Sequence, residues 1–170
     1  SRKKYYYKEL IESGNIKVRY GVLRLIQELA ENNIEQFIVT TSGRDSLEPF
    51  LHTSLRSHLK FFSEIITYED VSKHKPYPDA YNLALKLSKK SNVNCIAIED
   101  SSIGVEAARS ANINCLLTLP PWSNSTQNIT KRANACVDNL GNKDKYSKVI
   151  YGNPLINKYV DYAYLTNIIS

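Results

Sequence analysis

The sequence predicts an α/β domain with a parallel sheet, and three observations carry this prediction. Residues 21–33 have apolar side chains at helical spacing and are followed by an apolar run at 37–39. A helix followed by a buried strand is half of a βαβ unit. A second apolar run, residues 95–98, ends in two carboxylates and turns at once into another helical pattern. The length of 170 residues is enough for one such domain with its own core.

The remaining elements follow the same alternation. The expected strands are residues 37–39, 64–67, 95–98, 114–119 and a short edge strand at 135–137. Helices are expected at 5–12, at 21–33, at 46–55 with Pro49 in the first turn, and at 80–89. A further helix should follow Ser101 or Ser102 as its cap, and the last, 159–169, should dock on the core. A polar loop is expected at 68–74 and a charged surface segment at 141–148.

Composition excludes several classes of function. The net charge is +5 and the pI about 9.0, but the Lys and Arg residues form no long basic block, so we expect no nucleic-acid partner; small phosphorylated molecules fit this charge as well. No apolar run approaches the ~20 residues that span a membrane, and no signal peptide opens the sequence, so we expect a cytoplasmic protein without a membrane partner. The three cysteines include no Cys-x-x-Cys, and we expect neither disulfides nor zinc.

An acidic pair marks the carboxyl end of the strand at 95–98. Glu99 and Asp100 would lie in the crevice where ligands bind in open α/β sheets. Two adjacent carboxylates repel each other unless a cation holds them, and Mg²⁺ is the hard cation that such oxygen ligands favour. The alternative is that Asp100 begins a helix and Glu99 is a solvated neighbour.

Hydroxyl side chains mark the end of the strand at 37–39. Thr40, Thr41 and Ser42 are followed by a glycine and an arginine before the next helix. Small hydroxyl residues and free backbone N–H groups at a strand end suit a phosphate oxyanion. The alternative is a Ser/Thr-rich turn with an ordinary helix cap.

A lysine stands between these two strand ends in the chain. Lys75 is followed by Pro76 and Pro78, which predict an extended, rigid lead-in to the helix at 80–89. Such a lead-in would hold Lys75 at a fixed point, where it could neutralise an anion. The alternative is a solvated surface charge.

The order of these motifs resembles that of the haloacid dehalogenase superfamily. Their amino-acid sequences resemble those of its CbbY-like, beta-phosphoglucomutase-like branch. The matching stretches are Arg19-Tyr20-Gly21-Val22, Val39-Thr40-Thr41-Ser42, Lys75-Pro76-Tyr77-Pro78-Asp79-Ala80-Tyr81 and Ile98-Glu99-Asp100-Ser101-Ser102-Ile103-Gly104. The resemblance covers residues 5–140 and implies a three-layer, Rossmann-like core around a parallel sheet.

The resemblance also implies a role for each candidate residue. Thr40 would bind the transferring phosphoryl group, with Thr41 and Ser42 assisting. Lys75 would neutralise that group and the attacking carboxylate. Asp100 would bind Mg²⁺ directly, and Glu99 would orient either the water shell of the metal or the lysine. These parts suit phosphoryl transfer, which depends mainly on positioning and charge stabilisation.

The departures from the family pattern are equally informative. The family begins with a strand that ends in Asp-x-Asp-Gly-Thr and carries the nucleophile, and the 170 residues contain no such motif. Residues 1–15 are expected to be a remnant of the helical cap or a linker, and 16–170 the core domain. The missing strand belongs between 37–39 and 95–98, so we expect a further N-terminal segment of the same gene to fill a gap there.

The function that follows is a Mg²⁺-dependent phosphohydrolase. The intact protein would act on a small phosphorylated metabolite, such as a sugar phosphate, through a phosphoaspartate intermediate, and residues 1–170 alone would be inactive. Two alternatives stay open: a phosphomutase of the same family, and a non-catalytic module that binds phosphate or Mg²⁺. The sequence does not identify the substrate.

Overall fold

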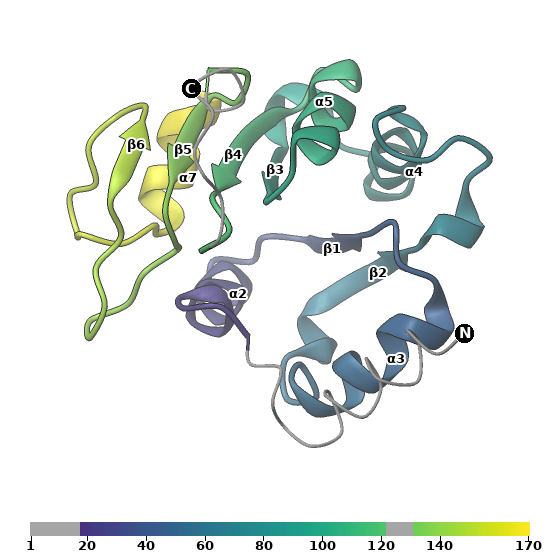
Figure 1. The fold of residues 1–170 in the computed structure, drawn as a ribbon, viewed down its shortest axis with the longest axis horizontal. Helices are drawn as coiled ribbons and strands as arrows, with labels where there is room; N and C mark the ends of the chain where they lie inside the picture. Colours follow the sequence, from purple (N-terminus) through teal and green to yellow (C-terminus); the bar gives the residue numbers. More distant parts are fainter. Residues whose placement is uncertain (1–17, 122–130) are drawn as a thin grey trace.

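The computed structural model describes residues 18–121 and 131–170, and it confirms the α/β class (Figure 1). The helices are α2 (Val22–Glu31), α3 (Arg44–Thr53), α4 (Asp79–Ser88), α5 (Ser102–Ser110) and α7 (Tyr162–Ile169). The strands are β1 (Gln36–Val39), β2 (Phe62–Ile66), β3 (Ile96–Glu99), β4 (Asn114–Thr118), β5 (Ala135–Val137) and β6 (Val149–Tyr151). Short 3₁₀ turns lie at Leu59–Phe61, Tyr68–Asp70 and Asn92–Asn94.

The strands form two separate groups. β1 pairs with β2 in parallel, and β3, β4 and β5 form a parallel run that ends with the antiparallel β6. Figure 1 shows the first group together with α3 and the second together with α5 and α7. The carboxyl ends of β1 and β3 lie at the same edge of the molecule, because Lys75 contacts both the Val39 carbonyl and Glu99.

Helices cover both faces of the larger sheet, as a three-layer fold requires. Cys115 of β4 packs into a cluster with Ala107 and Ala108 of α5. The next residue of the strand, Leu116, packs into a different cluster with Leu165 of α7. Because successive side chains of a strand point to opposite faces, this alternation places α5 on one face and α7 on the other.

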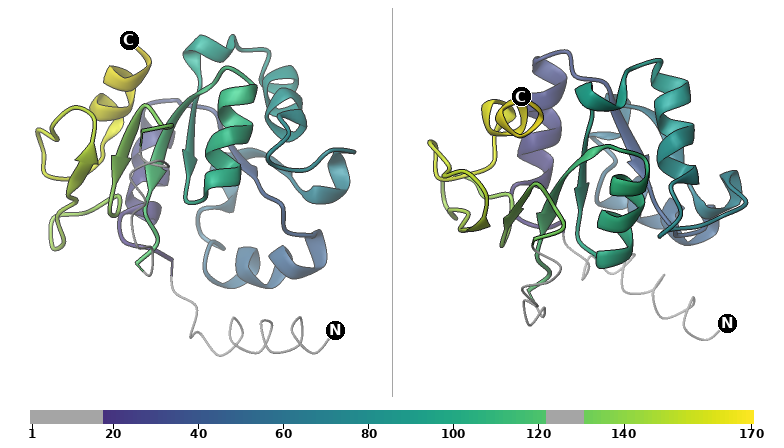
Figure 2. Two further views of the ribbon diagram at one scale, coloured as in Figure 1. Left: turned by 45° about the horizontal axis from the view of Figure 1, so that its top comes forward. Right: turned by 90° about the horizontal axis from the view of Figure 1, so that it is seen from above.

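Two helices connect the two strand groups. Leu25 of α2 belongs to the core cluster of the larger sheet, whereas its neighbour Ile26 belongs to the cluster that contains α3, β1 and β2. On the opposite face, Tyr81 of α4 is in a cluster that Val39 of β1 packs against and that includes Ala97 of β3. The groups are therefore joined through helix packing (Figure 2).

β1 and β3 do not pair with each other, as the expected gap requires. A cavity of about 940 Å³ lies along them, and its mainly apolar lining includes Leu25, Ile26, Phe37, Val39, Ile96 and Ile98. We call the space between β1 and β3 the slot. Ile98, in the middle of a strand, keeps 37% of its surface exposed, which shows that this part of the sheet is not fully covered.

Backbone groups of both strands point into the slot. The Thr40 N–H donates to the Ile66 carbonyl of β2, so the backbone groups of Thr40 face β2. Because successive residues of a strand direct their N–H and C=O groups to opposite sides, those of Phe37 and Val39 point away from β2. Cys115 faces β5, because its N–H and C=O bond to Asn134. Its neighbours in β4 therefore face β3, and this register leaves Ile96 and Ile98 with backbone groups toward the slot.

Two sequence expectations about helices and strands are wrong in detail. Pro49 lies inside α3 and not in its first turn, because the helix begins at Arg44, where the Gly43 carbonyl accepts the N–H groups of Ser46 and Leu47 at 3.0 Å. β5 is not an edge strand, since β4 and β6 pair with its two sides.

The lead-in at Lys75-Pro76 is a turn and not an extended segment, because the Tyr77 N–H donates to the His74 carbonyl at 3.0 Å. The expected helix at 5–12 and the domain boundary at residue 15 lie outside the described residues, so both stay predictions. Among the helices of the described ranges, none has the length and hydrophobicity needed to cross a membrane.

Candidate functional site

The sequence-predicted site residues gather at the carboxyl edge of the sheet. Thr40 directly follows β1, Glu99 ends β3, and Asp100 follows it. Lys75 lies four residues before α4 and reaches both strand ends: its ammonium donates to the Val39 carbonyl at 3.0 Å and forms an ion pair with Glu99. The lysine thus bridges the carboxyl end of the slot.

Lys75 is held on several sides. Its side chain is only 6% exposed, so it is not the solvated surface charge of the alternative interpretation. The ring of Tyr81 lies with its centroid 4.9 Å from the ammonium, within the range of a cation–π contact. A buried ammonium with these partners is fixed in place, which is the property that a phosphate-neutralising cation needs.

Glu99 is engaged by protein donors. One of its carboxylate oxygens, Oε1, accepts from both the Lys75 ammonium and the Tyr81 hydroxyl. Gly104 makes room for the same carboxylate, because a Cβ at that position would collide with it. Of the two roles left open for Glu99, these contacts favour orientation of the lysine over orientation of the water shell of the metal.

Asp100 is placed differently. Its side chain is exposed, and within the described ranges no hydrogen bond or ion pair reaches its carboxylate. An unpartnered carboxylate fits Mg²⁺, which binds one or two protein carboxylates and completes its octahedron with water and substrate phosphate oxygens. Residues 18–121 and 131–170 hold no group of three or more His, Cys, Asp or Glu suited to a metal, so Asp100 would supply only one part of such a shell.

The hydroxyl loop after β1 is partly self-satisfied. The Thr40 hydroxyl oxygen accepts the Ser42 N–H at 3.0 Å, which fixes the oxygen and leaves the hydroxyl hydrogen free to donate. Thr41 and Ser42 are exposed. The first N–H of α3, at Arg44, is already bonded to the Glu69 carboxylate at 3.2 Å. An anion in this region would therefore meet residues 40–42 and not the start of α3.

Two residues with clear structural roles received none from the sequence, although both stand in the quoted motifs. Arg19 donates to the Thr118 hydroxyl at 2.9 Å and to the carbonyls of Thr118, Leu119 and Asp138, which joins the ends of β4 and β5. Burial lowers the pKa of Arg19, against the raising effect of the Asp100 and Asp138 charges. Tyr81 is the second such residue, because its hydroxyl donates to Glu99. The only sign of this role in the sequence is its position as a hydroxyl-bearing aromatic residue in the first turn of α4.

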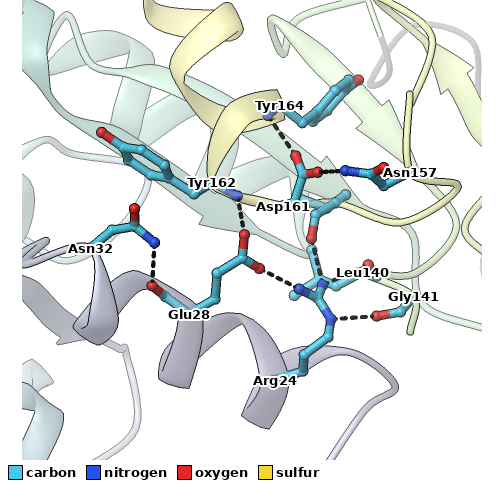
Figure 3. Close-up of polar contacts among 10 residues, drawn as sticks. Arg24, Glu28, Asn32, Leu140, Gly141, Asn157, Asp161, Tyr162 and Tyr164 are labelled. Carbon is cyan, nitrogen blue, oxygen red and sulfur yellow. Dashed lines mark hydrogen bonds and ion pairs between the residues drawn. The ribbon is translucent and has the colours of Figure 1, made fainter. Parts of the chain in front are cut away.

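The helix that covers the slot, α2, is fixed by a polar network at its far side (Figure 3). Arg24 pairs with Glu28 and donates to the carbonyls of Gly141 and Val160. Glu28 accepts the Tyr162 N–H at 2.8 Å, at the start of α7. The first residue of α2, Val22, donates its N–H to the Arg19 carbonyl at 3.2 Å, which connects this helix to the arginine at the site.

Comparison with known proteins places the chain in a family. The family model described as haloacid dehalogenase-like hydrolase matches residues 1–118. The chain belongs to this family. The result confirms the resemblance derived from the motifs around Thr40, Lys75 and Asp100.

Individual relatives point to the CbbY-like branch. The plasmid-encoded protein CbbY of Cupriavidus necator is 31% identical over 137 residues, which cover 80% of this chain and 53% of that protein. The crystal structure of a mutant CbbY from Rhodobacter sphaeroides in complex with xylulose-(1,5)bisphosphate has a TM-score of 0.68 and 26% identity, and the match covers 74% of this chain and 56% of that one. The beta-phosphoglucomutase of Clostridium difficile has a TM-score of 0.71 at 22% identity, over 98% of this chain and 63% of that one, and this likeness shows the fold alone.

The chain spans about half the length of the curated relatives it matches, with 47% of a CBBY-like protein of Arabidopsis thaliana and 53% of the Cupriavidus protein. These matches confirm the three-layer α/β core and the CbbY-like branch. The activity of the whole protein is therefore a proposal.

Proposed function

We propose that the intact protein is a Mg²⁺-dependent phosphohydrolase that acts on a small phosphorylated metabolite, a sugar phosphate. The observation that carries the proposal is the buried Lys75–Glu99 pair at the carboxyl end of the slot, beside the unpartnered carboxylate of Asp100. A fixed cation and a free carboxylate at one sheet edge suit a phosphate monoester together with its metal ion. The name of one structural neighbour, in complex with a sugar bisphosphate, supports the substrate class.

Each described residue has a part in the proposed reaction. Lys75 neutralises the phosphoryl oxygens and keeps the attacking carboxylate ionised. The Thr40 hydroxyl donates to a phosphoryl oxygen. Asp100 would hold Mg²⁺, which when bound supplies positive charge to the phosphoryl group. Glu99 keeps the lysine in place.

The nucleophile comes from outside the described residues in this proposal. A carboxylate attacks phosphorus, the ester P–O bond breaks, and the leaving alkoxide takes a proton from a general acid. Water then hydrolyses the phosphoaspartate, which releases inorganic phosphate and restores the carboxylate. The slot is the place from which such a carboxylate would face Lys75, so we propose that a strand from a preceding N-terminal segment fills the slot.

Two other functions remain candidates. A phosphomutase shares the first half of the reaction, with a second substrate hydroxyl in place of water. A non-catalytic module that binds phosphate or Mg²⁺ needs only the residues described here.

Calorimetric titration tests the site. Mg²⁺ and inorganic phosphate should each bind residues 1–170 weakly, because the chain supplies only part of each coordination shell. Asp100→Asn should abolish the Mg²⁺ heat and leave the phosphate heat, and Lys75→Ala should do the reverse. Lys73→Ala, a nearby exposed lysine, is the matched control. Unchanged binding in both site variants contradicts the assignment.

A further inference from the structure

The Tyr81 side chain touches both members of the buried ion pair. Its hydroxyl donates to Oε1 of Glu99, the same oxygen that accepts from Lys75, and its ring lies under the lysine ammonium. Tyr81 is only 7% exposed. Among the described residues, no other side chain makes a hydrogen bond or a cation–π contact with both charges, so Tyr81 is the residue best placed to set their relative geometry.

The shared oxygen limits how Glu99 can move. Two donors converging on one carboxylate oxygen fix both its position and the rotation of the group, because rotation about the last side-chain bond would break at least one of these bonds. Without the hydroxyl, Lys75 would be the only donor to that oxygen among the described residues. Burial and the Glu99 charge raise the pKa of Tyr81 well above its usual value, so the hydroxyl keeps its proton for donation.

We propose that Tyr81 is a positioning residue that acts through Glu99: it holds the carboxylate in the orientation that keeps Lys75 at the carboxyl end of the slot. This inference rests on the proposed function, because it gives Lys75 the task of meeting the phosphoryl group. The ring and the hydroxyl have separable parts. The ring supports the ammonium by packing and cation–π attraction, and the hydroxyl orients Glu99.

A purely structural role is the competing explanation, and a second tyrosine provides the control. Tyr164 is 4% exposed and donates its hydroxyl to the Asn153 carbonyl at 3.1 Å, in the cluster around α7. Tyr81→Phe and Tyr164→Phe each remove one hydroxyl from a buried aromatic residue. Both should lower stability to a similar degree, and only the first should affect the site.

The test uses the full-length protein, Mg²⁺ and a sugar phosphate. Tyr81→Phe should lower kcat/KM about tenfold, as expected when a hydrogen bond to a charged group is lost. Tyr81→Leu should lower kcat/KM further, because it also removes the ring beneath the ammonium. Tyr164→Phe should leave kcat/KM unchanged. Equal effects of the two Tyr→Phe changes would overturn the proposal.

A double-mutant cycle tests whether Tyr81 acts through Glu99. In the Glu99→Gln background, Tyr81→Phe should have less than about a twofold further effect, since the orienting target is already changed. If the two losses multiply, Tyr81 does not act through Glu99 and the proposal is wrong. If the wild-type protein hydrolyses no phosphate ester, the proposed function fails, and the same variants are then compared by their affinity for inorganic phosphate. There an unchanged affinity in Tyr81→Phe would overturn the positioning role.

Discussion

Filling the slot should stabilise the protein strongly. The perturbation is a five-residue strand of Val and Ile ending in Asp, joined to Ser1 through a flexible linker and compared with residues 1–170 alone. Four residues, Phe37, Val39, Ile96 and Ile98, direct backbone groups into the slot, and of their eight groups the Val39 carbonyl already accepts from Lys75. Seven groups are therefore left to pair with an added strand.

The magnitude follows from these groups and from the apolar lining. Seven hydrogen bonds at about 0.5 to 1.5 kcal/mol each contribute about 4 to 10 kcal/mol. Ordering five residues costs about 5 to 10 kcal/mol, so the hydrogen bonds alone only offset the backbone entropy. Three buried aliphatic side chains at about 1.5 to 3 kcal/mol each add about 5 to 9 kcal/mol, and this term decides the net gain. An apolar strand is required.

Thermal unfolding and hydrogen exchange measure the result. A gain of this size should raise Tm by at least about 10 °C for a chain of this length. The amides of Val39 and Ile98 should become protected, while those of Ile38 and Ala97, which face β2 and β4, should change little. The same strand with two prolines is the control, because it lacks two donors. An unchanged Tm together with unprotected slot amides would refute the strand-filling argument.

Three further predictions concern single residues. Gly104→Ala should reduce phosphate affinity about tenfold, because the Cβ of the alanine would displace the Glu99 carboxylate. This loss is expected even though alanine stabilises a helix by about 1 kcal/mol relative to glycine. An unchanged phosphate affinity, measured by calorimetry, would contradict the geometry. Burial raises the pKa of Cys115 to about 12 and that of Cys136 to about 11. At pH 8 iodoacetamide should therefore leave both thiols unmodified until the protein unfolds, as measured by mass spectrometry. Rapid labelling of the native protein would show instead that the β4–β5 core opens. Hydrogen bonds from the Thr67 N–H and hydroxyl lower the pKa of Asp70, so the Asp70 carboxylate binds a proton less tightly in the folded state than in the unfolded chain. The folded state gains stability from this difference above about pH 4, and it loses that stability as the pH falls through the lower pKa of the folded state. Asp70→Asn should therefore lower Tm at pH 6 and have little effect near pH 2, and an equal effect at both would contradict the assignment.

Local chemistry made much of the fold predictable. Ser101 caps α5 as its position before an apolar helical pattern indicates, and its side chain accepts the Gly104 N–H at 3.2 Å. β1, β3 and β4 were also recognisable, because each contains a short and continuous apolar run. β6 was not predicted. Val149, Ile150 and Tyr151 form a strand because they pair with β5, and such a non-local contact leaves little trace in a short segment.

The candidate site shows the same division between local and non-local information. The residue types at Thr40, Lys75 and Asp100 suggested their chemistry, and the order of the motifs suggested the family. The partnership of Lys75 with Glu99 could not be derived from spacing, because 24 residues separate them and the fold alone brings them together. Tyr81 was missed for a related reason: a buried aromatic residue on a helix usually packs in the core, and only the structure shows where its hydroxyl points.

The most direct test of the account is the release of inorganic phosphate from sugar phosphates in the presence of Mg²⁺. Two preparations are compared: the full-length protein, and residues 1–170 shown by intact mass to be a pure 19.3 kDa species. We expect hydrolysis by the full-length protein that is lost in EDTA, and none by residues 1–170, because the nucleophile reaches Lys75 only from a strand in the slot. Hydrolysis by the pure 19.3 kDa species would contradict it.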